Sequence, residues 1–255
     1  MNPIAKRIGN NLEELICFEY GEQNSEKIAE LRRKNFDFAP VRKDGQFIAL
    51  VKIPYIDESK ISYSELMNLP IVDSDEDIKV LLEALENSEF LIFKTEDEYS
   101  GFFTLSDTNT HRFRSEFYGI LAETEIALAK VISNMYNNPW DWISGMEEKN
   151  QVGILGNWEI AKRKDLEINP INYATFSQML NIVAKSNEFR QHLGISSKRN
   201  FDGNHRNLIE FRNKIMHPVR QLITSREDIK VLRGDYLRLL TLLDKLQTFQ
   251  QEPTL

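Results

Sequence analysis

The sequence contains one cysteine, Cys17, among its 255 residues. A single thiol excludes an intramolecular disulfide bond and any zinc site built from several cysteines. No stretch of 18 apolar residues occurs, and residues 1–10 contain no apolar segment of the kind found in secretion signals. We therefore expect a cytosolic protein with no membrane partner.

Glycine and proline are also scarce, with 11 and 8 residues, which excludes collagen-like and low-complexity chains. The net charge of −7 is unevenly distributed: residues 1–114 carry 14 basic and 22 acidic side chains, and residues 115–255 carry 18 and 17. Between Lys198 and Arg238 there are ten basic and five acidic residues. This asymmetry predicts two domains, 1–114 and 115–255, of which the second is the one expected to meet a polyanion.

The first 114 residues contain an internal repeat of 52 residues. Each copy has the order helix, strand, strand, with predicted helices at 26–34 and 75–86 and predicted strands at 38–42, 46–53, 90–93 and 101–105. A shift of 52 residues places Phe38 on Phe90 and Ala49 on Gly101. The repeat predicts two similar modules packed together, because each is too small to bury its own faces.

These residues resemble the two halves of a tandem CBS-domain pair, over about residues 12–109. The segment Gly101-Phe-Phe-Thr104-Leu-Ser-Asp107 matches the G-x-x-T-x-x-D motif of that family. The resemblance implies that Thr104 and Asp107 hold the ribose of an adenine nucleotide, such as AMP, ADP or ATP, as a regulatory ligand. The first copy has Lys52 and Tyr55 at these positions, so we expect one nucleotide site per chain.

The same two residues also allow a purely structural role. A carboxylate accepts hydrogen bonds from two neighbouring ribose hydroxyls, and a glycine near the site lets a ligand approach the backbone. In the alternative, Thr104 is an ordinary strand residue and Asp107 caps the segment that follows it.

From Ser115 onward the apolar residues recur at helical spacing. A long first helix, helices at 173–184 and 201–216, and a last helix from about Arg226 predict an antiparallel, all-α helical bundle. The fold class is therefore α+β. The predicted junction, residues 110–116, contains no flexible padding, and His111, beside Arg112 and Arg114, is expected to be a surface residue of it.

One motif in the helical half carries a second resemblance. Arg212-Asn213-Lys-Ile-Met-His217-Pro218 resembles the R-N-x-x-x-H signature of HEPN domains, helical bundles that often act as metal-independent ribonucleases. The resemblance implies catalysis by Arg212, Asn213 and His217 in a homodimer, with 2′,3′-cyclic phosphate ends and no catalytic cofactor. We expect Pro218 to move His217 out of the helical conformation, toward a substrate.

The chemistry of these side chains fits RNA cleavage. Arginine remains charged and can contact two phosphate oxygens, while histidine can take a proton near neutral pH. A carboxylate from the first bundle helix, Glu123 or Glu125, could orient the arginine or the histidine. In the alternative, Arg212 pairs with Glu210 or Asp202, and His217 only caps a helix.

The two resemblances together predict a nucleotide-regulated endoribonuclease, a stress or phage-defence effector that acts on RNA. One alternative is a non-enzymatic adenine-nucleotide sensor or adaptor whose bundle binds a protein. Another is the toxin of a pair that is silenced by an antitoxin partner. Burial of Arg212 or His217 in the core would favour the adaptor.

Overall fold

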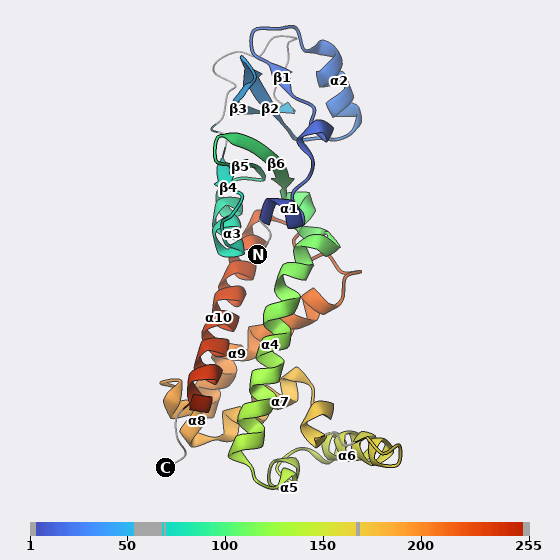
Figure 1. The fold of residues 1–255 in the computed structure, drawn as a ribbon, viewed down its shortest axis with the longest axis vertical. Coiled ribbons are helices and arrows are strands. Elements are labelled where there is room, and N and C mark those ends of the chain that lie inside the picture. The colour runs from blue at the N-terminus through green and yellow to red at the C-terminus, as the bar shows by residue number, and fades with distance from the viewer. Residues whose placement is uncertain (1–3, 54–67, 69, 167–168, 252–255) are drawn as a thin grey trace. The chain divides into compact units, whose positions relative to one another are not determined.

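The computed structural model describes residues 4–53, 68, 70–166 and 169–251 (Figure 1). The chain forms two compact units, the first of residues 1–113 with 223–233 and the second of residues 114–222 with 234–255. The predicted division into 1–114 and 115–255 differs from these units mainly in one segment, because residues 223–233 pack with the first unit. Tyr55 lies outside the described residues.

The first unit contains two three-stranded sheets of mixed direction, in the orders β1-β2-β3 and β4-β5-β6. In each sheet the first strand is parallel to the second, and the second and third form an antiparallel hairpin. The elements are α1 (Ile4–Ile8), η1 (Leu12–Glu14), β1 (Phe18–Glu19), α2 (Ser25–Arg33), β2 (Phe38–Lys43), β3 (Gln46–Lys52), β4 (Ile71–Asp73), α3 (Ile78–Asn87), β5 (Phe90–Thr95), β6 (Glu98–Thr104) and η4 (Leu105–Asn109).

The two hairpins have the same register, which confirms the 52-residue repeat. Phe38 pairs with Lys52 in the first hairpin, and Phe90 pairs with Thr104 in the second. The irregularity after Val41 recurs after Phe93, 52 residues later. Asp44 and Glu96, also 52 residues apart, both have a positive φ in the tight turns of the hairpins.

The two modules share an apolar interface inside the first unit. Leu50 from one hairpin is buried in one cluster with Phe90 and Ile92 from the other. The Phe47 and Tyr99 rings meet edge to face with centroids 4.8 Å apart. Each small module therefore completes its core with the other, as the repeat predicted.

The second unit is largely helical, so the predicted α+β fold class is confirmed. Its elements are α4 (His111–Met135), α5 (Pro139–Ile143), α6 (Glu148–Lys162), η5 (Pro170–Tyr173), α7 (Phe176–Lys185), α8 (Asn187–His192), α9 (Lys198–Met216) and α10 (Arg226–Gln251). The first residues of α4 and residues 226–233 of α10 belong to the first unit.

The bundle is antiparallel only in part. Near the start of α4, the Tyr118 hydroxyl donates to the Ile215 carbonyl at the end of α9, across 3.4 Å. The Phe117 ring packs edge to face on Tyr236, in the first half of α10, with centroids 5.5 Å apart. Helix α9 thus runs opposite to α4, whereas α10 runs in the same direction as α4 (Figure 1).

The predicted junction at residues 110–116 is mostly helical. Helix α4 begins at His111, four residues before the predicted start at Ser115. His111 is exposed, as predicted. The Arg114 side chain, three residues later, is completely buried. Arg114 lies three residues before the buried Phe117, and this spacing places it on the apolar face of α4.

Candidate functional site

The G-x-x-T-x-x-D segment ends at a cavity in the first unit. Strand β6 ends at Thr104, and the 3₁₀ helix η4 places Asp107 one turn later. Both residues line a cavity of about 430 Å³, together with Asn10, Glu14, Leu15, Ile16, Leu31, Asn35, Phe36, Asp37, Phe38, Glu89, Phe90, Phe102, Leu105 and Ser106. The two residues that the sequence motif indicates, Thr104 and Asp107, therefore line the same cavity.

Asp107 also stabilises the local structure, as in the alternative interpretation, but the N-cap residue of the following segment is Thr104 and not Asp107. Asp107 Oδ2 accepts hydrogen bonds from the Thr104 backbone N–H and from the Thr104 hydroxyl, both across 2.7 Å. Thr104 is the N-cap of η4, and Asp107 lies three residues later. One carboxylate oxygen thus holds the turn, and Oδ1 is the oxygen that a ribose hydroxyl would reach.

Gly101 lies against the backbone of the N-terminal segment. A Cβ atom added to Gly101 would lie 3.0 Å from the backbone oxygen of Asn10. Asn10 and the adjacent Phe102 exchange backbone hydrogen bonds of 2.8 and 3.1 Å. The glycine thus accommodates the close approach of the chain's own N-terminal segment, which a side chain here would push back by a few tenths of an ångström.

The cavity is lined by aromatic and acidic side chains. The Phe90 and Phe102 rings stack with centroids 5.9 Å apart, and the Phe36 side chain, which is half-exposed, also lines the cavity. Among the described lining residues there is no lysine or arginine. Such a cavity suits the base and the ribose of a nucleotide better than its phosphates.

The equivalent position in the first repeat carries a lysine in place of the threonine. Lys52, which corresponds to Thr104, places its Nζ 5.6 Å from the centroid of the Phe38 ring. Lys52 is not among the residues that line the cavity. The two copies thus place chemically different side chains at this position, and one nucleotide site per chain stays a prediction.

The R-N-x-x-x-H motif lies at the end of α9. The helix is fixed in the second unit by its buried residues Phe201, Leu208, Phe211 and Ile215. His217 is the C-cap residue, with φ −113° and ψ 81°, so it has left the helical conformation as expected for a residue before Pro218. Its side chain is exposed, and its carbonyl accepts the Arg220 N–H across 3.1 Å.

Arg212 is held by a carboxylate of another helix. Its Nε donates to Oε1 of Glu125 in α4 across 3.2 Å, and the two side chains are 29% and 34% exposed. The alternative pairings with Glu210 and Asp202 were wrong, because these acids pair with Lys214 and Lys198. Among the described residues, no hydrogen bond joins Arg212 to His217.

Asn213 lies on a different side of α9 from the Arg212 ion pair. It lines a groove of about 400 Å³ with Arg206, Ile209, Glu210, Lys214, Arg220 and Gln221. Within one chain the three motif residues therefore have different surroundings: Arg212 is in an ion pair, Asn213 lines a groove and His217 lies at an exposed helix end.

Sequence reasoning missed the importance of Arg114 for this segment. The buried guanidinium donates hydrogen bonds to the backbone carbonyls of Lys214 and Arg220. Carbonyls at a helix C-terminus have no partner within the helix, and a cation there is favourable. Burial lowers the pKa of Arg114 from its ordinary value. Arg114 thus fixes both sides of the loop that carries His217.

Two negative findings apply to the described part of the chain. No helix there is long and apolar enough to cross a membrane. The described residues also contain no group of three or more histidine, cysteine or acidic side chains that could hold a metal ion.

Solved structures of CBS domains are similar to part of the chain. The CBS domain of a bacterial CNNM/CorC family Mg²⁺ transporter, in complex with ATP, is 18% identical, with a TM-score of 0.36 over 42% of this chain and 83% of that one. A conserved CBS domain protein of unknown function from Thermoplasma acidophilum is 18% identical, with a TM-score of 0.35 over 42% and 68%. A CBS domain of a putative transporter from Clostridium difficile 630 is 21% identical, with a TM-score of 0.36 over 42% and 89%.

No protein-family model and no curated protein matches the chain. The region that is similar to these solved CBS domains covers about 42% of the chain and contains two three-stranded sheets, and a largely helical region follows.

Proposed function

We propose that the protein is an endoribonuclease whose activity is regulated by an adenine nucleotide. The nucleotide binds in the cavity at Thr104 and Asp107, and RNA is cleaved by Arg212, Asn213 and His217. One observation carries the catalytic part of this proposal: neither Arg212 nor His217 is buried in the core of its own protomer. Both side chains remain accessible to a substrate, which favours an enzyme over an adaptor.

The proposed reaction needs no metal ion. The 2′-oxygen of RNA attacks the adjacent phosphorus, and His217 takes the proton from the 2′-hydroxyl. The bond between phosphorus and the 5′-oxygen breaks, and the 5′-oxygen leaves with a proton from the solvent. Arg212 stabilises the added negative charge on the phosphate oxygens. The products are a 2′,3′-cyclic phosphate and a 5′-hydroxyl.

The chemistry of the cavity supports a nucleoside as the regulatory ligand. Asp107 Oδ1 accepts from the ribose hydroxyls, and the aromatic side chains contact the adenine base. The phosphates extend toward the solvent, since the lining residues supply no cation. The ATP complex of the similar transporter domain agrees with this class of ligand.

The proposal is tested by incubation of the purified full chain with labelled RNA, with and without AMP, ADP or ATP. We expect Arg212→Ala and His217→Ala each to reduce cleavage by about 10² or more, because each removes a positioned transition-state interaction. Arg199→Ala, on an exposed part of the same helix, is the matched control and should cleave like the wild type.

EDTA should leave cleavage unchanged. Cleavage that EDTA abolishes, or that neither substitution affects, would contradict the proposed chemistry. If the wild type binds nucleotide but cleaves no RNA under any condition, the non-enzymatic adaptor replaces the enzyme. The homodimer and the antitoxin partner that the HEPN resemblance implies remain predictions. Light scattering of the purified protein tests whether it forms the homodimer.

A further inference from the structure

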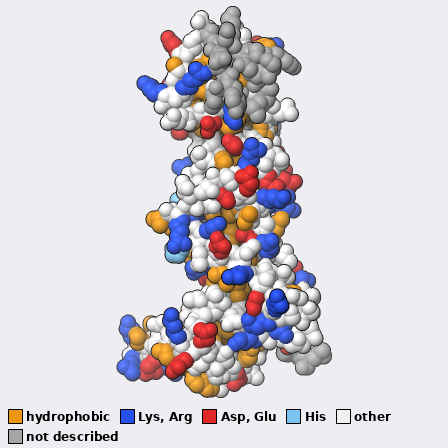
Figure 2. Space-filling model, turned by 180° about the vertical axis from the view of Figure 1, so that it is seen from behind, with side chains coloured by type: hydrophobic (Ala, Val, Ile, Leu, Met, Phe, Trp, Pro, Cys, Tyr) orange, Lys and Arg blue, Asp and Glu red, His pale blue; other side chains and the backbone are white. Residues whose placement is uncertain are grey.

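The groove beside Asn213 is lined by more basic than acidic side chains. On the face of the molecule drawn in Figure 2, basic and acidic side chains are interspersed. The groove is lined by three basic residues, Arg206, Lys214 and Arg220, and by one acidic residue, Glu210. Asn213 and Gln221 add uncharged side-chain amides. This local excess of positive charge indicates an anionic ligand.

Two of the three cations are not neutralised. Among the described residues, no carboxylate pairs with the side chain of Arg206 or Arg220, and both side chains are exposed. Lys214 Nζ lies 3.6 Å from Glu210 Oε1, in an exposed pair of the kind that contributes little free energy. The two guanidinium groups can therefore each bind an oxyanion without first breaking an ion pair.

The backbone that carries these cations is fixed before any ligand arrives. Arg206 and Lys214 project from α9, and the Arg220 carbonyl is held by the buried guanidinium of Arg114. The Arg220 N–H closes a turn onto the His217 carbonyl across 3.1 Å. A loop that is already ordered loses less conformational entropy when it binds a ligand.

We infer that this groove binds the sugar–phosphate backbone of single-stranded RNA. Guanidinium groups contact phosphates through two parallel hydrogen bonds, and side-chain amides can contact sugars and base edges. Along the chain, the proposed catalytic base His217 lies between Asn213 and Arg220, two of the residues that line the groove. This inference rests on the proposed function and deepens it, since it assigns a binding surface to the substrate.

The test measures RNA binding without cleavage. The probe is a fluorescein-labelled, single-stranded RNA with 2′-O-methyl groups, which has no 2′-hydroxyl for the proposed reaction. Fluorescence anisotropy of the full chain is measured between about 50 and 200 mM salt, because phosphate contacts make affinity depend on salt. The variants are Arg206→Ala, Arg220→Ala and the double variant, with Arg199→Ala as the exposed arginine of α9 outside the groove.

We expect each groove variant to weaken binding at least about fivefold at low salt, and the control to bind like the wild type. The slope of log affinity against log salt should fall by about 0.7 for each cation removed from a single-strand contact. Circular dichroism should show unchanged helix content, because both side chains are exposed.

Wild-type affinity and slope in both groove variants would overturn the inference. So would a wild type that binds polyglutamate but not RNA, since the groove would then belong to an acidic protein partner. Failure of the proposed function is a separate result: RNA with free 2′-hydroxyls would remain intact while the 2′-O-methyl probe still bound through Arg206 and Arg220.

Discussion

Arg212 Nε donates a hydrogen bond to Glu125 Oε1 across 3.2 Å, and this contact joins the motif on α9 to the middle of α4. The guanidinium uses its Nε for this bond, and its two terminal nitrogens can still contact a phosphate. We therefore propose that Glu125 positions Arg212.

Glu125→Gln is expected to lower RNA cleavage by about tenfold, because the neutral amide holds the guanidinium less firmly. Arg212→Ala should lower RNA cleavage further, because it removes the proposed phosphate contact itself. Single-turnover cleavage assays measure both effects. Glu123→Gln is the matched control on the exposed side of α4. Equal activity of the Glu125 variant and the wild type would exclude a positioning role.

Asp107→Ala should weaken adenine-nucleotide binding by at least about 1.5 kcal/mol, because a charged acceptor for the ribose is lost. Titration calorimetry measures the affinity. Asp97→Ala, at a fully exposed position outside the cavity, should bind normally. Since Asp107 also accepts two hydrogen bonds from Thr104, thermal unfolding of both variants must be compared. A folded Asp107 variant with unchanged affinity would place the ligand elsewhere.

Arg114→Ala is expected to lower the free energy of unfolding by about 3 kcal/mol. The substitution leaves the carbonyls of Lys214 and Arg220 without their donors and opens a cavity where the side chain was buried. Urea denaturation measures this change, and Arg112→Ala, at an exposed position two residues earlier, should stay within about 0.5 kcal/mol of the wild type. A neutral result for Arg114→Ala would show that the loop does not depend on this contact.

His205 makes stability depend on pH. Burial lowers the pKa of His205, and the hydrogen bond from its Nδ1 to the Phe201 carbonyl, 2.9 Å long, opposes this effect only in part. Below the unfolded pKa of about 6.5, the unfolded chain binds more protons than the folded one, so stability falls as the pH falls toward the folded pKa. The loss is at most about 1.4 kcal/mol per pH unit.

We therefore expect the free energy of unfolding to decrease from pH 7 to pH 5.5, and His205→Gln to flatten this dependence. Urea denaturation at several pH values tests it. An unchanged slope in the variant would assign the pH dependence to other groups.

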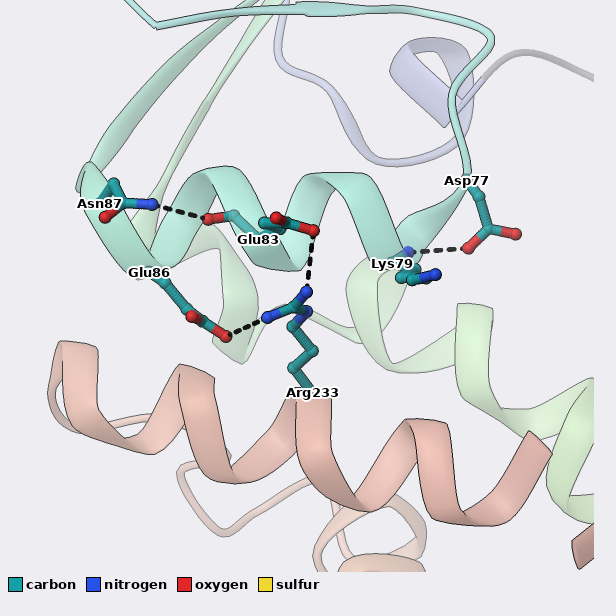
Figure 3. Close-up of polar contacts among 6 residues, drawn as sticks. All are labelled: Asp77, Lys79, Glu83, Glu86, Asn87 and Arg233. Carbon is teal, nitrogen blue, oxygen red and sulfur yellow. Dashed lines mark hydrogen bonds and ion pairs between the residues drawn. The ribbon is translucent and has the colours of Figure 1, made fainter. Parts of the chain in front are cut away.

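Arg233 connects α10 to the second module of the first unit. Its two terminal nitrogens bind Glu83 and Glu86 of α3, at 2.8 and 3.1 Å (Figure 3). Residues 226–233 of α10 belong to the first unit, whereas residues 234–251 belong to the second. This continuous helix is our candidate for the element through which nucleotide binding alters cleavage.

Saturating nucleotide is expected to change wild-type cleavage severalfold, and a tenfold change requires about 1.4 kcal/mol of differential affinity. Arg233→Ala should reduce this response while nucleotide affinity and basal cleavage remain near wild type. Cleavage assays across a nucleotide titration measure the response. Lys230→Ala, one turn earlier, is the control. A fully responsive Arg233 variant would contradict transmission through this contact.

The sequence by itself determined the repeat, the hairpins and the fold class. A shift of 52 residues predicted pairs such as Phe38 with Phe90, and the two hairpins do share one register. These features are local: strand pairing follows from a short turn, and helical spacing follows from the residues of one segment. The same local rule placed His217 outside the helix, because Pro218 restricts the residue before it.

Only the tertiary structure decided which distant groups meet. The sequence offered Arg212 acidic candidates within its own helix and on the first bundle helix, and the packing of α9 beside α4 selects one of the latter, Glu125, 87 residues away. Arg114 binds carbonyls about 100 residues away, and Gly101 lies against the backbone of Asn10. The physical reason is common to all three: a side chain's partner depends on which helices and strands pack beside it, and no short-range spacing encodes that packing.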